Sequence, residues 1–195
     1  MTDAARVKGN ILTSRLAFVR GRGGEALLGK VLGRLPADDQ RALKGTLLVT
    51  SAYPLELNLR LDNAIAAELS PGDRQRVFIE MGRASAEMSL SGPQRGFLRA
   101  GDPHGLLAYT EAIYSYYYSV GRRIYQKTGP TSACLTTFDA EGVTETDCLT
   151  VVGWHERAIE LSGGSNVRVS HPQCRVRGAL HCEYLIDWGE PPGLG

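Results

Sequence analysis

The chain has 195 residues, of which 43% are hydrophobic and 22% are charged, and its formal net charge is +1. This size and composition are typical of one folded domain with a substantial hydrophobic core, so residues 1–195 are expected to form a single domain. The basic residues are scattered, which argues against a nucleic-acid-binding protein. No apolar run approaches the ~20 residues that a membrane-spanning helix needs, and the stretch "MTDAARVKGNIL" lacks the apolar region and cleavage site of a secretory signal, so a cytoplasmic protein is expected.

Residues 1–125 are expected to be mainly helical. Several stretches place apolar residues three and four positions apart, which is the spacing of one face of a helix. Pro36 ends the first of them, and the last opens with a Ser70-x-x-Asp73 cap and Pro71 in its first turn. These patterns predict helices over 23–35, 36–45, 53–69 and 70–90.

The longest helix is predicted over residues 104–125, because apolar and aromatic side chains recur there every seven residues. One stripe of this helix consists of Leu107, Tyr114, Tyr118 and Tyr125. Six tyrosines are too many for one exposed face, so we expect at least one stripe to face a cavity or a second subunit. The candidate lining of a small-molecule pocket is Tyr114, Tyr117, Tyr118, Phe78, Met81 and Trp154.

Residues 126–190 are expected to be mainly β. Four stretches rich in Thr, Val, Ile and aromatic residues predict strands, and one short helix over 154–164 interrupts them. The fold class is therefore α+β, with N-terminal helices packed on a C-terminal antiparallel sheet. The predicted strands cover 131–142, 143–153, 165–171 and 179–188.

The segment 171–182, "HPQCRVRGALHC", concentrates cysteine and histidine. A hairpin turn at Gly178-Ala179 would bring Cys174 opposite Cys182, and Pro172 would turn the chain so that His171 and Cys174 form a close pair. With Cys148 from the preceding strand, the candidate ligand set is Cys148, His171, Cys174 and Cys182. Three thiolates and one imidazole suit a tetrahedral zinc ion.

Two other interpretations of these residues stay open. The cysteines could be small buried hydrophobic residues, with His171 an ordinary surface group. Cys174 and Cys182 could instead form a disulfide across the hairpin, although a cytoplasmic compartment is reducing. Cys134 lies outside the candidate set.

The stretch "VVGWHERAIELSGGSNVRVSHPQCRVRGALHCEYLIDW" resembles the C-terminal signature of 4-vinyl-reductase-type domains. These domains share a superfamily with heme-NO-binding domains and TRAPP transport subunits. The resemblance implies a structural zinc with ligand order Cys, Glu, Cys, Cys, as in the sensory domains of phenol-responsive bacterial activators. His171 stands where those sensors have Glu, and both residue types bind zinc. Over its whole length the chain is also similar to a paralogous family of small myxobacterial proteins with no established activity.

The expected function is non-catalytic. The superfamily resemblance implies a domain that binds a small hydrophobic or aromatic ligand and signals through a protein partner, with zinc as a structural ion because protein fills its whole coordination shell. The alternative is a dimerising scaffold without a ligand. No catalytic motif stands out, and neither His104 nor His155 lies in a recognisable heme-binding motif.

Overall fold

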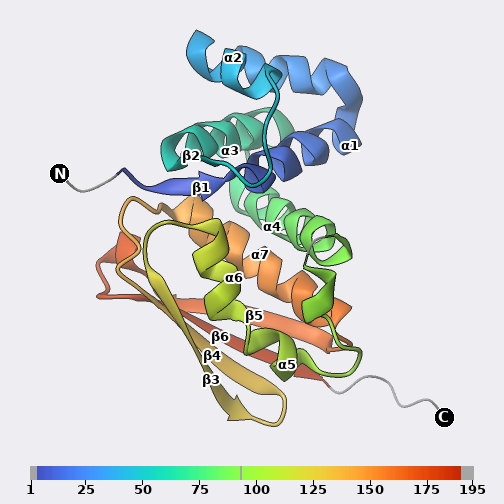
Figure 1. The fold of residues 1–195 in the computed structure, drawn as a ribbon, viewed down its shortest axis with the longest axis vertical. Helices are drawn as coiled ribbons and strands as arrows, with labels where there is room; N and C mark the ends of the chain where they lie inside the picture. The colour runs from blue at the N-terminus through green and yellow to red at the C-terminus, as the bar shows by residue number, and fades with distance from the viewer. Residues whose placement is uncertain (1–3, 93, 190–195) are drawn as a thin grey trace.

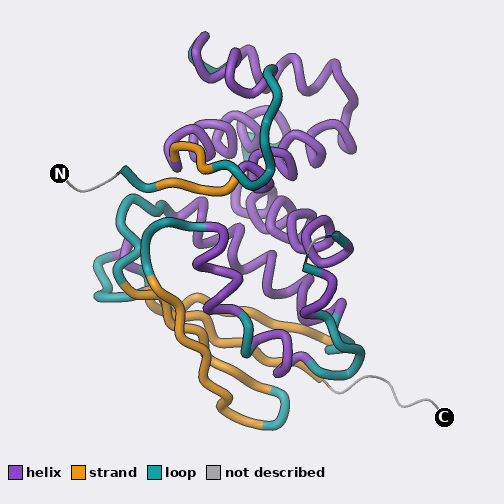
Figure 2. Tube along the Cα trace, viewed as in Figure 1, coloured by secondary structure: helices purple, strands orange, loops and turns teal. Residues whose placement is uncertain are grey.

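The computed structural model describes residues 4–92 and 94–189, which form seven α-helices and six β-strands. Figure 2 shows the strands of the larger sheet gathered at one end of the molecule, with most of the helices stacked above them. This arrangement is α+β, as the sequence predicts. The helices are α1 Gly9–Gly33, α2 Ala37–Lys44, α3 Leu55–Leu69, α4 Arg74–Ser91, α5 Pro103–Leu107, α6 Thr110–Tyr117 and α7 Glu145–Leu161.

The larger sheet has four strands in the order β3-β4-β6-β5, and every neighbouring pair is antiparallel. Its buried face shows the alternation that the sequence predicts: Cys182, Tyr184, Ile186 and Trp188 of one strand are all buried. Helix α7 packs on this face (Figure 1). The strands are β3 Arg122–Gly129, β4 Ser132–Phe138, β5 Ser165–Gln173 and β6 Cys182–Gly189.

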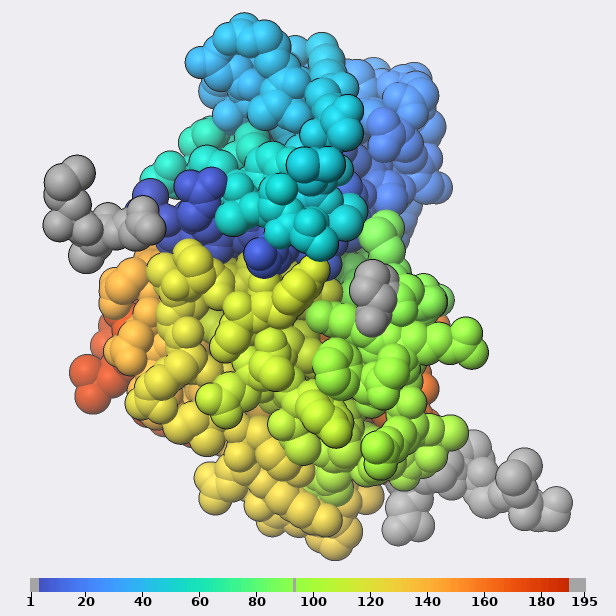
Figure 3. Space-filling model, viewed as in Figure 1, coloured from blue at the N-terminus to red at the C-terminus, as the bar shows by residue number. Residues whose placement is uncertain are grey.

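A second, two-stranded sheet ties the N-terminus to the middle of the chain. Strand β1 (Arg6–Lys8) pairs with β2 (Ala52–Pro54), and Val7 also forms an isolated bridge with Tyr118 at the end of α6. Figure 3 shows the N-terminal segment and the α6 region in contact on this side of the molecule. The contact brings together residues more than a hundred positions apart and closes one side of the cavity described below.

Helices α4 and α7 cross at unusually short distance because glycines face each other's backbone. A Cβ atom placed on Gly82 would lie 2.0 Å from the carbonyl oxygen of Thr150, and one on Gly153 would lie 1.9 Å from that of Ile79. Only glycine fits at such a crossing. Helix α7 is thereby held between α4 and the sheet (Figure 1).

The prediction of one long helix over residues 104–125 is wrong. The chain forms α5 and α6 and then turns into strand β3 at Arg122. Gly121 has a φ of +79°, a left-handed conformation that glycine adopts without strain, and it marks the turn from helix to strand. The seven-residue repeat of apolar side chains also fits the buried face of two short helices and a strand.

The prediction of a strand over residues 143–153 is also wrong, because this stretch is the first half of α7. The side chains of Thr144 and Asp147 form a reciprocal capping box at the start of that helix. The T-x-x-D pattern was visible in the sequence, and it outweighs the β-branched residues that follow. Cys148 consequently lies in the first helical turn and not at the end of a strand.

Two predicted helix starts also differ from the structure. Helix α4 begins at Arg74, where the Asp73 side chain accepts a hydrogen bond from the backbone N–H of Arg76, so Ser70 and Pro71 precede the helix. Helix α1 begins at Gly9, and the predicted segment 23–35 falls in its second half, after a break in helical geometry at Gly23 and Gly24.

The hydrophobic core is divided between the helices and the sheet. Phe78 and Met81 of α4 pack with side chains of α1 and α3, while Cys148, Tyr184 and Ile186 belong to a second cluster between α7 and the sheet. Among the described residues, no helix combines the length and the hydropathy that crossing a membrane requires.

Candidate metal centre and ligand cavity

Four side chains from three neighbouring segments meet at one end of the larger sheet. Cys148 comes from the first turn of α7, His171 from β5, Cys174 from the turn after β5, and Cys182 from the start of β6. One potential ligand atom from each residue lies within 4.8 Å of all the others. The structure therefore brings together the four residues that the sequence selects, although their role as ligands remains a proposal.

The sulfur separations in this cluster match a tetrahedral thiolate site. The Cys148 sulfur lies 3.8 Å from that of Cys174 and 3.9 Å from that of Cys182. Two sulfurs that each lie ~2.3 Å from one zinc ion at a tetrahedral angle are ~3.8 Å apart. All four cysteines of the chain are free thiols in the structure. The structure therefore contains no disulfide between Cys174 and Cys182.

The surroundings of the cluster act in opposite directions on two of its thiols: the hydrogen bond with Cys182 and burial raise the pKa of Cys148, whereas Cys182 is favoured as the thiolate. Hydrogen bonding with Cys148 lowers the pKa of the Cys182 thiol to about 4, and His171 and the backbone N–H of Arg175 act in the same direction. The His171 ring stacks on Tyr184 at 4.4 Å, and its Nε2 atom is buried without a hydrogen-bond partner among the described residues. An imidazole held in place with a free nitrogen is suited to metal binding. Cys134 lies apart on β4, where its sulfur contacts the Thr136 hydroxyl.

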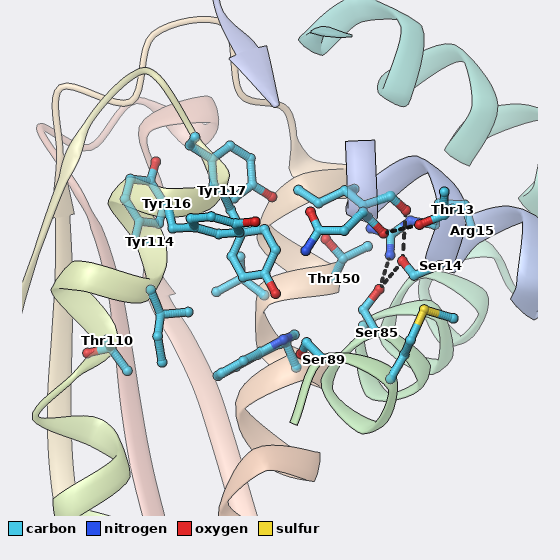
Figure 4. A pocket seen from close by; sticks show the side chains of 18 of the residues that line it. Thr13, Ser14, Arg15, Ser85, Ser89, Thr110, Tyr114, Tyr116, Tyr117 and Thr150 are labelled. Atoms are coloured by element: carbon cyan, nitrogen blue, oxygen red, sulfur yellow. Dashed lines mark hydrogen bonds between the residues drawn. The ribbon is translucent and has the colours of Figure 1, made fainter. Parts of the chain in front are cut away.

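A cavity of about 270 Å³ lies among α1, α4, α6, α7 and the start of β3 (Figure 4). Of the predicted pocket residues, Tyr114, Tyr117, Tyr118 and Trp154 line it. Phe78 and Met81 do not, because they point into the core that α4 shares with α1 and α3. The predicted stripe of Leu107, Tyr114, Tyr118 and Tyr125 lines the cavity only in part. Leu107 packs in the core over the sheet, and the hydroxyl of Tyr125 contacts Nδ1 of His104 at 2.7 Å.

One end of the cavity carries a buried polar network from α1, α3 and α4. Arg15 donates from Nε to Asp62 at 2.7 Å and from Nη1 to the Ser85 hydroxyl at 2.6 Å, and Ser14 contacts the same hydroxyl (Figure 4). Both charged groups of this ion pair are buried, and each is the counter-charge of the other. No local sequence pattern predicts this network, because its hydrogen bonds join residues that are 47 or more positions apart.

His155 of α7 lines the cavity as a neutral imidazole. Burial lowers its pKa to about 3, and the positive charge of Arg123 contributes. Its Nδ1 lies 2.8 Å from the carbonyl oxygen of Val151 and must carry the ring proton, since a carbonyl only accepts. Nε2 is therefore an acceptor, and it has no partner among the described residues.

Arg123 of β3 lines the cavity from the side of the sheet and was missed by the sequence analysis. It is 5% exposed, and its Nε donates to the Thr137 hydroxyl at 3.0 Å. The guanidinium carbon lies 4.5 Å from the Tyr114 ring centroid and 5.6 Å from that of Tyr184. Arg122 beside it is exposed, so the two arginines point to opposite faces of the strand. Predicting a strand over 122–129 would have been enough to place one of them on the buried face.

The sequence identifies the family of this chain. Residues 20–189 match the model of DUF2378, described as a protein of unknown function, and the chain belongs to that family. A search of curated protein sequences finds no match.

The fold is that of H-NOX domains. An H-NOX protein from S. oneidensis in the Fe(II) ligation state has a TM-score of 0.74 at 16% identity, with 96% of this chain and 99% of that chain covered. The H-NOX domain from Shewanella oneidensis in its Fe(II)CO state, solved by NMR, has a TM-score of 0.72 at 18% identity, with coverage of 93% and 98%. Unliganded Fe(II) H-NOX from K. algicida has a TM-score of 0.70 at 12% identity, with coverage of 96% and 100%.

Two further solved structures with similar folds, at TM-scores of 0.66 and 0.65, come from studies of heme distortion, so the fit of the present cavity to heme is a direct question. Heme iron needs an axial ligand such as an imidazole or a thiolate. The free Nε2 of His155 is shielded even from a water-sized probe, and His104 lies outside the lining with both ring nitrogens in contact with oxygen atoms. At about 270 Å³ the cavity also lies just below the usual ~300–1,000 Å³ of small-molecule sites. The described residues do not fit a heme in this arrangement.

Proposed function

We propose that this chain is a non-catalytic small-molecule-binding or sensory domain, stabilised by a structural zinc ion, which acts in the cytoplasm through a protein partner. The observation that carries the proposal is the combination of a tyrosine-lined cavity beside the middle of helix α7 with a four-residue cysteine and histidine cluster at the start of the same helix. The H-NOX-like fold supports a sensory role, and the resemblance of the C-terminal part to 4-vinyl-reductase-type domains supports zinc at the cluster.

The zinc ion in this proposal is structural because Cys148, His171, Cys174 and Cys182 would fill all four positions of a tetrahedral site. Binding there ties the start of α7 to β5 and β6, so the metal would contribute directly to folding. A closed site leaves no position for substrate or water, which is consistent with a protein that is not an enzyme.

A dimerising scaffold is the second candidate, and one surface feature favours it. Leu48, Val49 and Tyr116 are 58%, 49% and 40% exposed, and the last two of these residues also line the cavity. Large apolar side chains at the edge of a cavity suit either a partner protein or a homodimer.

Native mass spectrometry of the purified protein tests both candidates in one measurement. The proposal expects one zinc ion per chain and a bound small molecule that is lost on denaturation. A dimer with zinc but without any small molecule would favour the scaffold. A metal-free, ligand-free monomer would contradict both functions.

A further inference from the structure

The buried guanidinium of Arg123 has no counter-charge from the described part of the chain. Across residues 4–92 and 94–189 no carboxylate lies within ion-pair distance of it, although the side chain is 5% exposed. Arg15, the other arginine of the cavity lining, is 3% exposed and is paired with Asp62. Both arginines line the same cavity, and among the described residues only Arg15 has a carboxylate within ion-pair distance.

A guanidinium cannot lose its proton to escape the cost of burial, because its pKa lies far above neutral pH. A buried charge is therefore expected to be paired with an opposite charge. The contacts to Tyr114 and Tyr184 and the hydrogen bond to Thr137 hold the guanidinium in place, but none of these groups is an anion. The remaining N–H donors of Arg123 have the planar fork arrangement that carboxylates match with two parallel hydrogen bonds.

The other residues that line the cavity indicate what kind of molecule could bring an anionic group to Arg123. Among the residues that the structure describes, no aspartate or glutamate lines the cavity, so with Arg15 neutralised the net charge of this lining is that of Arg123. Ile113, Tyr117 and Trp154 supply apolar and aromatic walls. The volume of about 270 Å³ suits a molecule of roughly the size of one substituted aromatic ring.

We propose that the cavity binds a small organic monoanion, an aromatic carboxylic acid, with its carboxylate on Arg123 and its ring among Ile113, Tyr117 and Trp154. This inference rests on the proposed small-molecule-binding function and specifies the ligand class. Arg123 also lines a second, smaller space together with Asp147, Cys148 and Cys182, so this carboxyl group and the thiols are the competing source of negative charge. The experiment below distinguishes the two.

The probes are 3-phenylpropionate and its neutral amide, titrated into the dialysed, zinc-containing protein at pH 7.5. Calorimetry measures affinity, and tryptophan fluorescence in a Trp188→Phe background, where Trp154 is the remaining tryptophan, reports binding at the cavity. The proposal expects the carboxylate to bind at least tenfold more tightly than the amide, because only the carboxylate supplies the missing charge. Arg123→Gln is expected to remove this preference, and Arg123→Lys is expected to retain part of it, since lysine keeps the charge but not the fork.

Arg122→Gln is the matched control. Arg122 is the adjacent arginine of the same strand, but it is exposed and packs over Phe138 outside the cavity. Its substitution should leave the preference for the carboxylate unchanged. If Arg123→Gln does not fold, the comparison of carboxylate with amide on the parent protein and on Arg123→Lys still decides the question.

Equal affinity for the two probes would overturn the assignment of an anion while leaving a small-molecule function intact. Retention of the tenfold preference in Arg123→Gln, together with loss of zinc, would overturn it in favour of the cysteine cluster as the partner of Arg123. Binding of neither probe at millimolar concentration would overturn the ligand class, and the native mass spectrum would then decide independently whether the protein carries any small molecule.

Discussion

Cys148 and His155 lie seven residues apart on α7, and they show how burial acts differently on two side chains of one helix. Cys148 meets two other thiols at the helix start, where a shared metal ion can neutralise them. His155 meets aromatic rings and the positive Arg123, so it stays neutral. Because of Cys148, the free energy of unfolding is expected to depend on bound zinc. Because of His155, it is expected to depend on pH.

Removal of one thiol should show whether the metal is structural. Cys174→Ser is expected to bind less than one zinc per chain and to lose about 3 kcal/mol or more of unfolding free energy, roughly 6–12 °C in melting temperature. Elemental analysis and thermal unfolding measure the two effects. Cys134→Ser is the control, because Cys134 lies on β4 outside the cluster, and it should keep its zinc. An apo protein as stable as the zinc form would show that any metal is adventitious.

The depressed pKa of His155 predicts a loss of stability on acidification. Its pKa of about 3 in the folded protein lies below the ordinary value of 6.5 for histidine, so between these values the unfolded chain binds a proton that the folded chain does not. Stability should therefore fall as the pH drops below 6.5, by up to about 2 kcal/mol from this group at pH 5.

Unfolding by urea at pH 7.5 and pH 5.0 measures this dependence. In His155→Gln the difference between the two pH values should shrink by up to about 2 kcal/mol relative to the parent. His181→Gln, at a half-buried histidine beside Phe138, serves as the control and should show the parental difference. An unchanged difference in His155→Gln would contradict a neutral, buried imidazole.

At the scale of elements, the crossing of α4 and α7 positions both the cavity and the cluster. Gly153→Ala would place a methyl group 1.9 Å from the carbonyl oxygen of Ile79, so the two helices must separate. We expect a loss of about 3 kcal/mol or more in unfolding free energy, as for a severely overpacked core position. Chemical denaturation measures it.

Gly29→Ala is the matched control for that substitution. Gly29 lies in an exposed part of α1, and a Cβ atom there meets no other atom within 4 Å. Because alanine favours the helix, this variant should gain about 0.5–1 kcal/mol. A Gly153→Ala variant as stable as the parent would show that the helix crossing is looser than the structure indicates.

At the scale of the whole molecule, the tyrosines in and next to α6 allow an experiment to distinguish the sensory function from the scaffold function. Tyr114 and Tyr118 stack at 5.0 Å in the cavity wall, whereas Tyr109 packs on Phe97 outside the cavity. Alanine at both 114 and 118 is expected to abolish retention of a co-purified small molecule, or dimerisation, while zinc stays bound. Native mass spectrometry reports all three properties, and Tyr109→Ala is the control. A double variant that merely unfolds, from a parent with neither ligand nor dimer, would assign these tyrosines to the core.

Strands β4, β5 and β6 and the grouping of the cysteines were predictable because their signals are local, whereas β3 begins inside the predicted helix over 104–125. Alternation along 182–188 identifies the buried face of β6, and the hairpin brings residues 171–182 together within a dozen positions. Cys148 lies with the other three residues, as the candidate set predicts, but it belongs to helix α7 and not to a strand. The capping box of Thr144 and Asp147 is the local signal for this helix. The extent of one domain over residues 1–195 stays a prediction.

The sequence by itself determined the α+β class, the main helices before residue 92, and the candidate set Cys148, His171, Cys174 and Cys182. These features depend on periodicity and on short spacings, which a linear pattern records. Only the three-dimensional packing shows that residues 104–125 divide into two helices and a strand, and that Arg123 lines a cavity without a carboxylate partner among the described residues. Both depend on packing between segments more than a hundred positions apart, such as Val7 against Tyr118, which no local preference specifies.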